Sequence, residues 1–321
     1  MRVLISVDME GAAGVVDPED VRPGHSEYER NRRQLTAEAS AAVRGVHAAD
    51  PGAEVLVTEA HSAFRNLLPE LLDRRSVLLR GKPKPHGMMA GLADNVDAVV
   101  CIGYHGKAGT PGSVLAHTIN SGVVADVRCE GRSLGELGLN TALAAHSGVP
   151  VVLVSGDDTV AVEAADIAPG MHTVVVKQGL GTRAAALLHP DEACERIEAE
   201  VPPALADRAA VRPLRFDGPV TVEVDVLMPH MTERALLVPG VELKDGCTLR
   251  YAASDFGAAY QVIQRCSAAS DSAAGLRAAG LQRGSNGSGR GPGQGGGAEP
   301  GGAGDRAQAG RGAHTRPRPW P

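Results

Sequence analysis

The amino-acid sequence predicts an α/β fold in which an open, mostly parallel sheet is flanked by helices, together with a second, smaller α/β sub-domain. Four continuous apolar runs lie in the first half of the chain, and a helical pattern separates the first two. Such runs are typical of parallel strands buried on both faces, and their alternation with helices favours an open parallel sheet. Near residue 220 the pattern changes to alternating apolar and polar residues, which indicates a strand with one face in water.

The expected elements follow the chain in order. The four buried strands are RVLISV, AEVLVTE, VDAVVCIGY and VPVVLVSG, at residues 2–7, 53–59, 96–104 and 149–156. A helix is predicted over 27–49, where apolar side chains recur every three or four positions, and another over 135–147. Residues 219–226, PVTVEVDV, form the alternating strand of the sub-domain.

The amino-acid composition of the chain changes after residue 266. Residues 1–266 are expected to be globular, with the α/β core over roughly 1–200 and the mixed sub-domain over roughly 200–266. Residues 267–321 hold 15 of the 40 glycines and, apart from Trp320, almost no large apolar side chain. Such a segment cannot bury enough surface to offset its conformational entropy. We therefore expect a disordered, Gly/Arg-rich C-terminal tail.

Composition limits the classes of function. The chain has 321 residues, 43% hydrophobic content and a net charge of −6, so it can build a large core. Its mild acidity argues against nucleic acid as a partner, and no apolar run approaches the ~20 residues of a membrane span. No charged and then apolar leader is present. The five cysteines are scattered without a CxxC pair, which indicates reduced thiols in a cytoplasmic protein.

Acidic and histidine side chains follow the predicted parallel strands where each strand ends. Asp8 and Glu10 come after the first strand, His61 after the second and His105 after the third. Successive strand residues alternate faces, so Asp8 and Glu10 point the same way, at the edge where such sheets bind ligands. Two adjacent carboxylates repel each other unless a cation lies between them. The pattern therefore predicts a pair of divalent metal ions bridged by one carboxylate.

The ligand types favour zinc, with manganese or cobalt as alternatives. Two metal ions require a further acid, and Glu136, at the start of the helix over 135–147, is the best candidate. Each residue also has a structural interpretation. The two strand-end acids could begin a solvated loop, and a lone histidine could be a capping or core residue. Glu136 could be a first-turn acid that the helix dipole favours.

Three further segments are less specific. His117 follows a Gly/Pro loop and could be a loop histidine. The basic segment GKPKPHGMM, at 81–89, could bind a substrate carboxylate or could be a solvated loop. The segment KQGLGTR, at 177–183, lacks the full dinucleotide-binding fingerprint.

Taken together, the motifs resemble the zinc-dependent D-aminopeptidase family associated with bacterial dipeptide-transport operons. The matching pieces run in order over most of residues 1–265 and include SVDMEG (6–11), EAHS (59–62), GYH (103–105), GELGLN (135–140), GDD (156–158) and VKQ (176–178). The resemblance implies a cytoplasmic metallopeptidase that hydrolyses short peptides with an N-terminal D-amino acid. It also implies two zinc ions per subunit and a ring-shaped homo-oligomer.

The resemblance also implies roles for individual residues. Asp8 would bridge the metals, Glu10 and His105 would complete one site, and His61 and Glu136 the other. His117 matches the family's catalytic histidine, often described as a nucleophile, although the loop before it is about one residue longer than the family pattern. Metal-activated water is the expected attacking group, with His117 stabilising the oxyanion or transferring a proton. A covalent route through His117 is the alternative.

Two other functions are compatible with an acidic strand end. One is a magnesium-dependent phosphohydrolase, although magnesium prefers oxygen ligands and the two strand-end histidines have no role in it. The other is a non-catalytic, metal-binding oligomeric scaffold, against which the presence of His117 argues.

Overall fold

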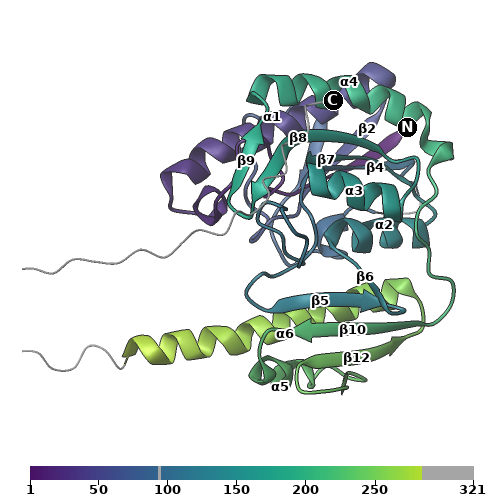
Figure 1. The fold of residues 1–321 in the computed structure, drawn as a ribbon. Coiled ribbons are helices and arrows are strands. Elements are labelled where there is room, and N and C mark those ends of the chain that lie inside the picture. Colours follow the sequence, from purple (N-terminus) through teal and green to yellow (C-terminus); the bar gives the residue numbers. More distant parts are fainter. Residues whose placement is uncertain (93–94, 284–321) are drawn as a thin grey trace, which may run out of the picture. The chain divides into compact units, whose positions relative to one another are not determined.

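The structure, a computed structural model, describes residues 1–92 and 95–283 (Figure 1). Residues 1–280 form one compact unit that contains two β-sheets. Within the described residues, no helix combines the length and the hydropathy that crossing a bilayer requires. The predicted class, a mostly parallel sheet flanked by helices with a smaller second sheet, is confirmed.

The larger sheet, sheet A, has the strand order β3-β2-β1-β4-β7-β8-β9, and only the β8–β9 pair is antiparallel. The four predicted strands are β1 (Arg2–Val7), β2 (Glu54–Glu59), β4 (Ala98–Tyr104) and β7 (Val151–Asp157). Three others were not predicted: β3 (Ser76–Leu79), β8 (His172–Gly181) and β9 (Ala184–Leu187). The strand order reverses between β1 and β4, and ligands bind beyond the carboxyl ends of the strands at such a point.

Helices cover both faces of sheet A (Figure 1). One face carries α1 (Ser26–Ala49) and α4 (Pro190–Ala206), which contact each other, and the other carries α2 (Glu136–His146) and α3 (Asp158–Ile167). The apolar residues with helical spacing that the sequence predicted form the buried face of α1: Leu35, Ala39, Ala42, Val43 and Val46. The helix ends at Ala49, two residues before Pro51, because a residue that precedes proline disfavours the helical conformation.

The smaller sheet, sheet B, is antiparallel with the order β11-β12-β10-β5-β6. Its strands are β5 (Val124–Cys129), β6 (Arg132–Ser133), β10 (Val220–Val226), β11 (Glu242–Leu243) and β12 (Thr248–Ala253). In β10, buried and half-buried residues alternate, as the sequence pattern predicts. The β5–β6 hairpin comes from the middle of the chain, so sheet B is not built from residues 200–266 alone.

Several short helices complete the fold: η1 (Pro18–Val21), η2 (Gly87–Met89), η3 (Arg208–Ala210), η4 (Pro229–Met231) and α5 (Thr232–Ala235). The last helix, α6 (Phe256–Arg283), contains the predicted boundary at residue 266. Ser267 and Ser270 lie in this helix and are buried, so the packed part of the chain extends beyond Cys266. The remainder of the predicted disordered tail, residues 284–321, lies outside the described residues.

Candidate metal centre

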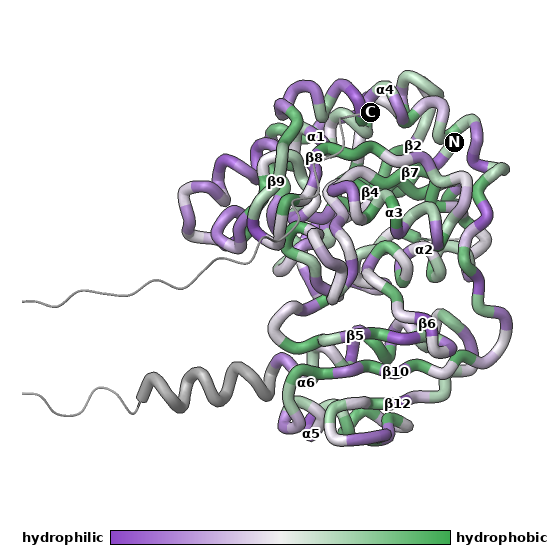
Figure 2. Tube along the Cα trace, in the orientation of Figure 1, coloured by the Kyte–Doolittle hydropathy of each residue, from purple (hydrophilic) through white to green (hydrophobic). Residues whose placement is uncertain are grey.

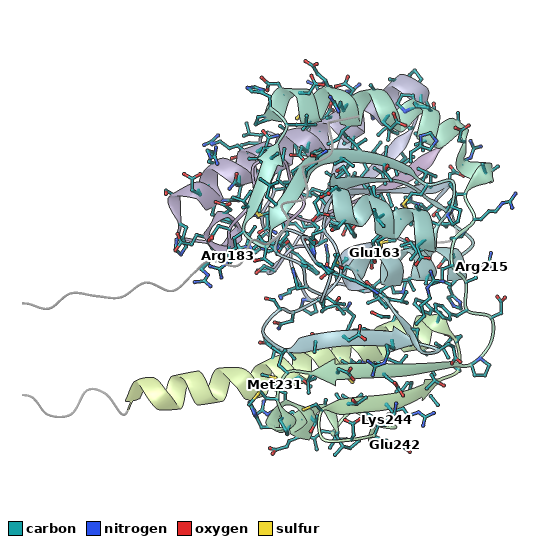
Figure 3. The ribbon with its side chains drawn as sticks, viewed as in Figure 1. Glu163, Arg183, Arg215, Met231, Glu242 and Lys244 are labelled. Atoms are coloured by element: carbon teal, nitrogen blue, oxygen red, sulfur yellow. The ribbon has the colours of Figure 1, made fainter. Side chains whose placement is uncertain are left out.

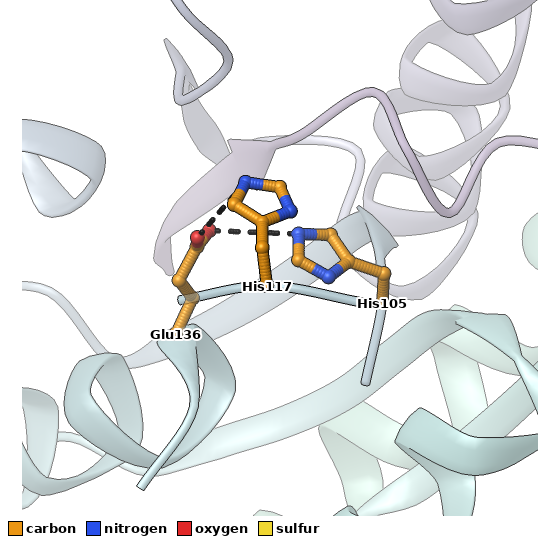
Figure 4. A group of neighbouring side chains, drawn as sticks. All are labelled: His105, His117 and Glu136. Carbon is orange, nitrogen blue, oxygen red and sulfur yellow. Dashed lines mark ion pairs between the residues drawn. The ribbon is translucent and has the colours of Figure 1, made fainter. Parts of the chain in front are cut away.

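The six residues singled out in the sequence lie together at the carboxyl edge of sheet A. Asp8 and Glu10 follow β1, His61 follows β2, His105 follows β4, Glu136 is the first residue of α2, and His117 lies in the loop between β4 and β5. All but His117 are buried, and His117 is half-buried. Figure 4 shows His105 and His117 beside Glu136.

A close backbone contact brings the end of β1 against the end of β4. The amide of Gly11 donates a hydrogen bond to the carbonyl of Gly103 at 2.8 Å. A Cβ atom on Gly11 would overlap the carbonyl oxygen of Tyr104, so only glycine fits at this position. The chain that leaves β1 therefore runs directly against the end of β4, which carries His105.

Each histidine has one ring nitrogen in contact with a backbone carbonyl and the other facing carboxylates. The carbonyls belong to Val21 for His61, to Gly106 for His105 and to Leu115 for His117, at 3.2, 3.0 and 2.9 Å. Such contacts fix the orientation of a metal-binding imidazole, because the nitrogen that donates to the carbonyl leaves the other one free to bind.

The free nitrogens and the three carboxylates form one network. His61 Nδ1 lies 2.9 Å from Glu10 Oε2 and 3.8 Å from Asp8 Oδ1, while His105 Nε2 lies 3.5 Å from Asp8 Oδ2 and 3.9 Å from Glu136 Oε2. His117 Nε2 lies 3.9 Å from Glu10 Oε1 and 3.6 Å from Glu136 Oε1. The rings of His105 and His117 stack, with centroids 4.4 Å apart.

Two buried atoms of this network lack a partner in the described chain and could instead bind a cation. Asp8 Oδ2 and His105 Nε2 are buried and have no hydrogen-bond partner among the described residues. Ligand atoms of Asp8, Glu10 and His105 lie within 4.8 Å of one another, and so do those of His105, His117 and Glu136. Buried polar atoms normally have partners, so this donor set is suited to divalent metal ions, with imidazole and carboxylate ligands that zinc accepts.

The electrostatics of the cluster agree with a site that requires positive charge. Burial, reinforced by Glu10, raises the pKa of Asp8, and burial together with Asp8 raises the pKa of Glu136. Burial would also raise the pKa of Glu10, but His61 and the other histidines lower it well below its usual value. Burial lowers the pKa of His61, yet Glu10 and Asp8 raise it to about 9. Protons on the histidines thus supply the charge that metal ions would otherwise provide.

A buried lysine holds the loop that carries the acids. Lys177, on β8, is fully buried, and its Nζ donates to the carbonyls of Glu10, Ala12 and Val15 at 2.5, 3.0 and 2.6 Å. The segment KQGLGTR therefore supports the site through its first residue. The sequence analysis did not assign this role to Lys177. A single lysine directly after the apolar run VVV, at residues 174–176, was a signal for a buried cation.

The cluster forms the floor of a cavity of about 1030 Å³. Asp8, Glu10, His61, His117 and Glu136 line it, together with residues from the segment 82–88 and from α6 between Tyr260 and Asp271. The basic segment 81–89 thus reaches the site, whereas the part played by α6 was not predicted. Tyr260 donates a hydrogen bond to Asn140 at 2.8 Å, which joins α6 to α2 beneath the cavity.

Comparison with known proteins identifies the family. The sequence profile of a family described as D-aminopeptidase matches residues 1–265. A D-aminopeptidase of Bacillus subtilis (strain 168) is 36% identical over 265 residues, which cover 82% of this chain and 95% of the relative. A solved structure, the Zn-dependent D-aminopeptidase DppA from Bacillus subtilis, described as a self-compartmentalizing protease, superposes with a TM-score of 0.80 at 34% identity and covers 84% of this chain and 98% of its own.

The fold and the cluster define an α/β protein with a metal-type donor set at the switch point of its parallel sheet. The chain belongs to the D-aminopeptidase family, and the family predicted from the sequence motifs is confirmed. It is therefore an enzyme of the peptidase class.

Proposed function

We propose that this protein is a zinc-dependent aminopeptidase that removes the N-terminal D-amino acid from short peptides, with two zinc ions in each subunit. The observation that carries the proposal is the group of three carboxylates and three histidines at one sheet edge, with Asp8 Oδ2 and His105 Nε2 buried and unpartnered within the described chain. The zinc dependence of the Bacillus subtilis relative supports the choice of metal.

The contact distances favour one division of the ligands. Asp8 lies next to both His61 and His105, through Oδ1 and Oδ2 respectively, and would bridge the two ions. Ligand atoms of Asp8, Glu10 and His105 lie within 4.8 Å of one another, so Glu10 and His105 would complete one site, while His61 and Glu136 would complete the other. This is the division that the family resemblance implied.

Zinc, when bound, polarises the scissile carbonyl and lowers the pKa of a coordinated water to about 7. His117 would act beside the ligands. Its Nδ1 is held by the carbonyl of Leu115, so its Nε2 faces the cavity next to Glu10 and Glu136. From there it can hold or move a proton at the leaving amine, or donate to the developing oxyanion. A covalent role for His117 is the alternative mechanism.

The same relative supports a proposal about assembly and location. We infer that this chain forms a ring-shaped homo-oligomer that admits short peptides and excludes folded proteins, as the description of the relative as self-compartmentalizing suggests. The five cysteines are free thiols, which agrees with a role in the reducing cytoplasm.

The proposal is tested by measuring the metal content of the purified protein and its rates on matched D-Ala and L-Ala dipeptides. We expect two zinc ions per chain and faster hydrolysis of the D-dipeptide. Hydrolysis of a phosphate ester with Mg²⁺, and of neither dipeptide, would instead support a phosphohydrolase. Bound zinc without hydrolysis of any short peptide would support a non-catalytic scaffold.

A further inference from the structure

The cavity is acidic on its floor and basic at its exposed rim. Asp8, Glu10 and Glu136 lie on the buried floor. The rim is formed by the segment 82–88 and by α6, and these two walls face each other: a Cβ atom on Gly87 would lie 3.6 Å from Gln264 Oε1. The rim therefore brings together side chains from two separate parts of the chain.

The two lysines of the segment 82–88 differ in the hydrogen bonds that their ammonium groups make. Lys84 Nζ donates to Thr58 Oγ1 and to the carbonyls of Glu59 and Leu79, at 2.8, 2.7 and 3.1 Å, so its three donors are occupied. Lys82 is exposed and pairs with no acid in the described chain. Its Nζ lies 5.7 Å from the ring centroid of Phe64, which also lines the cavity. This contact keeps a free ammonium group at the rim.

The opposite wall supplies a second cation. Arg265 follows Gln264 on α6, lines the cavity, is exposed and has no acidic partner within residues that the structure describes. Asp271 is the exposed acid on the same wall, six residues further along the helix, or about 9 Å at 1.5 Å per residue. Lys82 and Arg265 therefore form a positive rim, which we call the cationic rim.

We propose that the cationic rim is a subsite for the C-terminal carboxylate of the substrate, so that the enzyme selects short peptides with a free C-terminus. This inference rests on the proposed function, in which the N-terminal end of the peptide reacts on the floor. An extended dipeptide is about 7 Å long, so its carboxylate projects away from the reacting end. Lysine and arginine bind carboxylates through charge-assisted hydrogen bonds, and an amidated peptide offers them no charge.

The test compares D-alanyl-D-alanine with its C-terminal amide as substrates of the zinc-loaded enzyme. We expect the wild-type kcat/KM to favour the free acid by about 10-fold or more. The double variant Lys82→Gln/Arg265→Gln should lose this preference, with a rise of about 10-fold or more in KM for the free acid and little change for the amide. The control Arg33→Gln removes an exposed charge on α1, outside the cavity lining, and should leave the preference unchanged.

A binding measurement separates the subsite from turnover. In a zinc-loaded His117→Ala background, calorimetry should give a Kd for the free dipeptide that rises about 10-fold when the cationic rim is neutralised. Equal wild-type rates on acid and amide, or a preference that survives in the double variant, would overturn the subsite and leave the aminopeptidase proposal intact. Failure of the wild-type enzyme to hydrolyse either peptide would overturn both.

Discussion

Sheet A and sheet B differ in where their charged side chains lie. In sheet A, the interior of β1 and the whole of β4 are buried and mostly apolar, and the acids and histidines of the cluster follow β1, β2 and β4 where these strands end. In sheet B, charges lie on the strands themselves, as Arg128 and its partners on β5 and β10 do. Figure 2 shows the continuous apolar strands of sheet A, and Figure 3 shows Glu242 and Lys244 at the edge of sheet B.

The difference indicates which charges serve chemistry and which serve stability. The acids at the edge of sheet A are buried among one another, and a buried charge is costly unless it is paired. The charges on sheet B are partly exposed and already pair across strands, an arrangement that contributes a small amount to stability. We therefore expect substitutions at the edge of sheet A to abolish function and those on sheet B to leave it intact.

Asp8→Asn is expected to have the largest effect. It removes the proposed bridging carboxylate, so mass spectrometry should find both zinc ions lost, and kcat should fall on the order of 10³-fold or more. In the metal-free protein the same change should raise Tm, because burial and Glu10 disfavour the charged form of Asp8. The control Asp126→Asn, on sheet B, should keep both ions. Two zinc ions retained in Asp8→Asn would contradict the bridging role.

Within the edge of sheet A, His117 is expected to differ from His105. His105 is buried at the end of β4, and its free Nε2 faces Asp8, so His105→Ala should lose zinc and activity together. His117 lies in a loop, and His117→Ala should keep its zinc while kcat falls about 10²-fold with KM little changed. A zinc-free His117→Ala protein would make this residue a ligand, and full activity would remove it from the mechanism.

The sequence predicted the edge of sheet A well because the relevant signals are local. Continuous apolar runs marked β1, β2, β4 and β7, and the carboxyl ends of parallel strands meet at one edge, so residues far apart in the chain could be placed together. The close contact between Gly11 and the end of β4 was not predicted, although a glycine directly after Glu10 was a signal for it.

The cavity walls were harder to predict because they depend on long-range packing. Helix α6 continues through a segment whose composition indicated disorder, and Ser267 and Ser270 are buried there although neither is apolar. Lys84 and Lys82 are two residues apart in one basic segment and both line the cavity, yet the Nζ of Lys84 is bonded to Thr58 and to two backbone carbonyls, whereas Lys82 is exposed. Only the folded positions of β2 and β3 distinguish them. The pairing of each histidine with a particular carboxylate also depends on side-chain geometry.

The stability of the metal-free protein should depend on pH through His61. Glu10 and Asp8 raise the pKa of its imidazole in the folded state to about 9, above the unfolded value near 6.5. The proton therefore stabilises the fold fully below pH 6.5, and this contribution, about 3 kcal/mol at most, is lost as the pH rises toward 9. Tm of chelator-treated protein should fall over this range. His61→Gln should make the fall smaller without abolishing it, because Asp8 and Glu136 also raise the pKa of His105. A Tm that is constant or rises between pH 6.5 and 9 would contradict this assignment.

The smallest effect is expected on sheet B, from Arg128→Gln. Its guanidinium contacts Asp126, Glu223 and Asp225, and Asp225 on β10 receives two of these bonds, at 2.5 and 2.8 Å. Removing the cation leaves three acids close together on a partly exposed face, so we expect a loss of about 1 kcal/mol in the free energy of unfolding, reduced by salt. Zinc content and kcat should stay unchanged, because none of the six cluster residues lies on β5 or β10. Denaturant unfolding at low and high salt measures the first effect. The double variant Arg128→Gln/Asp225→Asn should recover part of the loss, since it relieves the repulsion that the single change creates. A loss of zinc in Arg128→Gln would show that sheet B holds the cluster in place through the β5–β6 hairpin between His117 and Glu136.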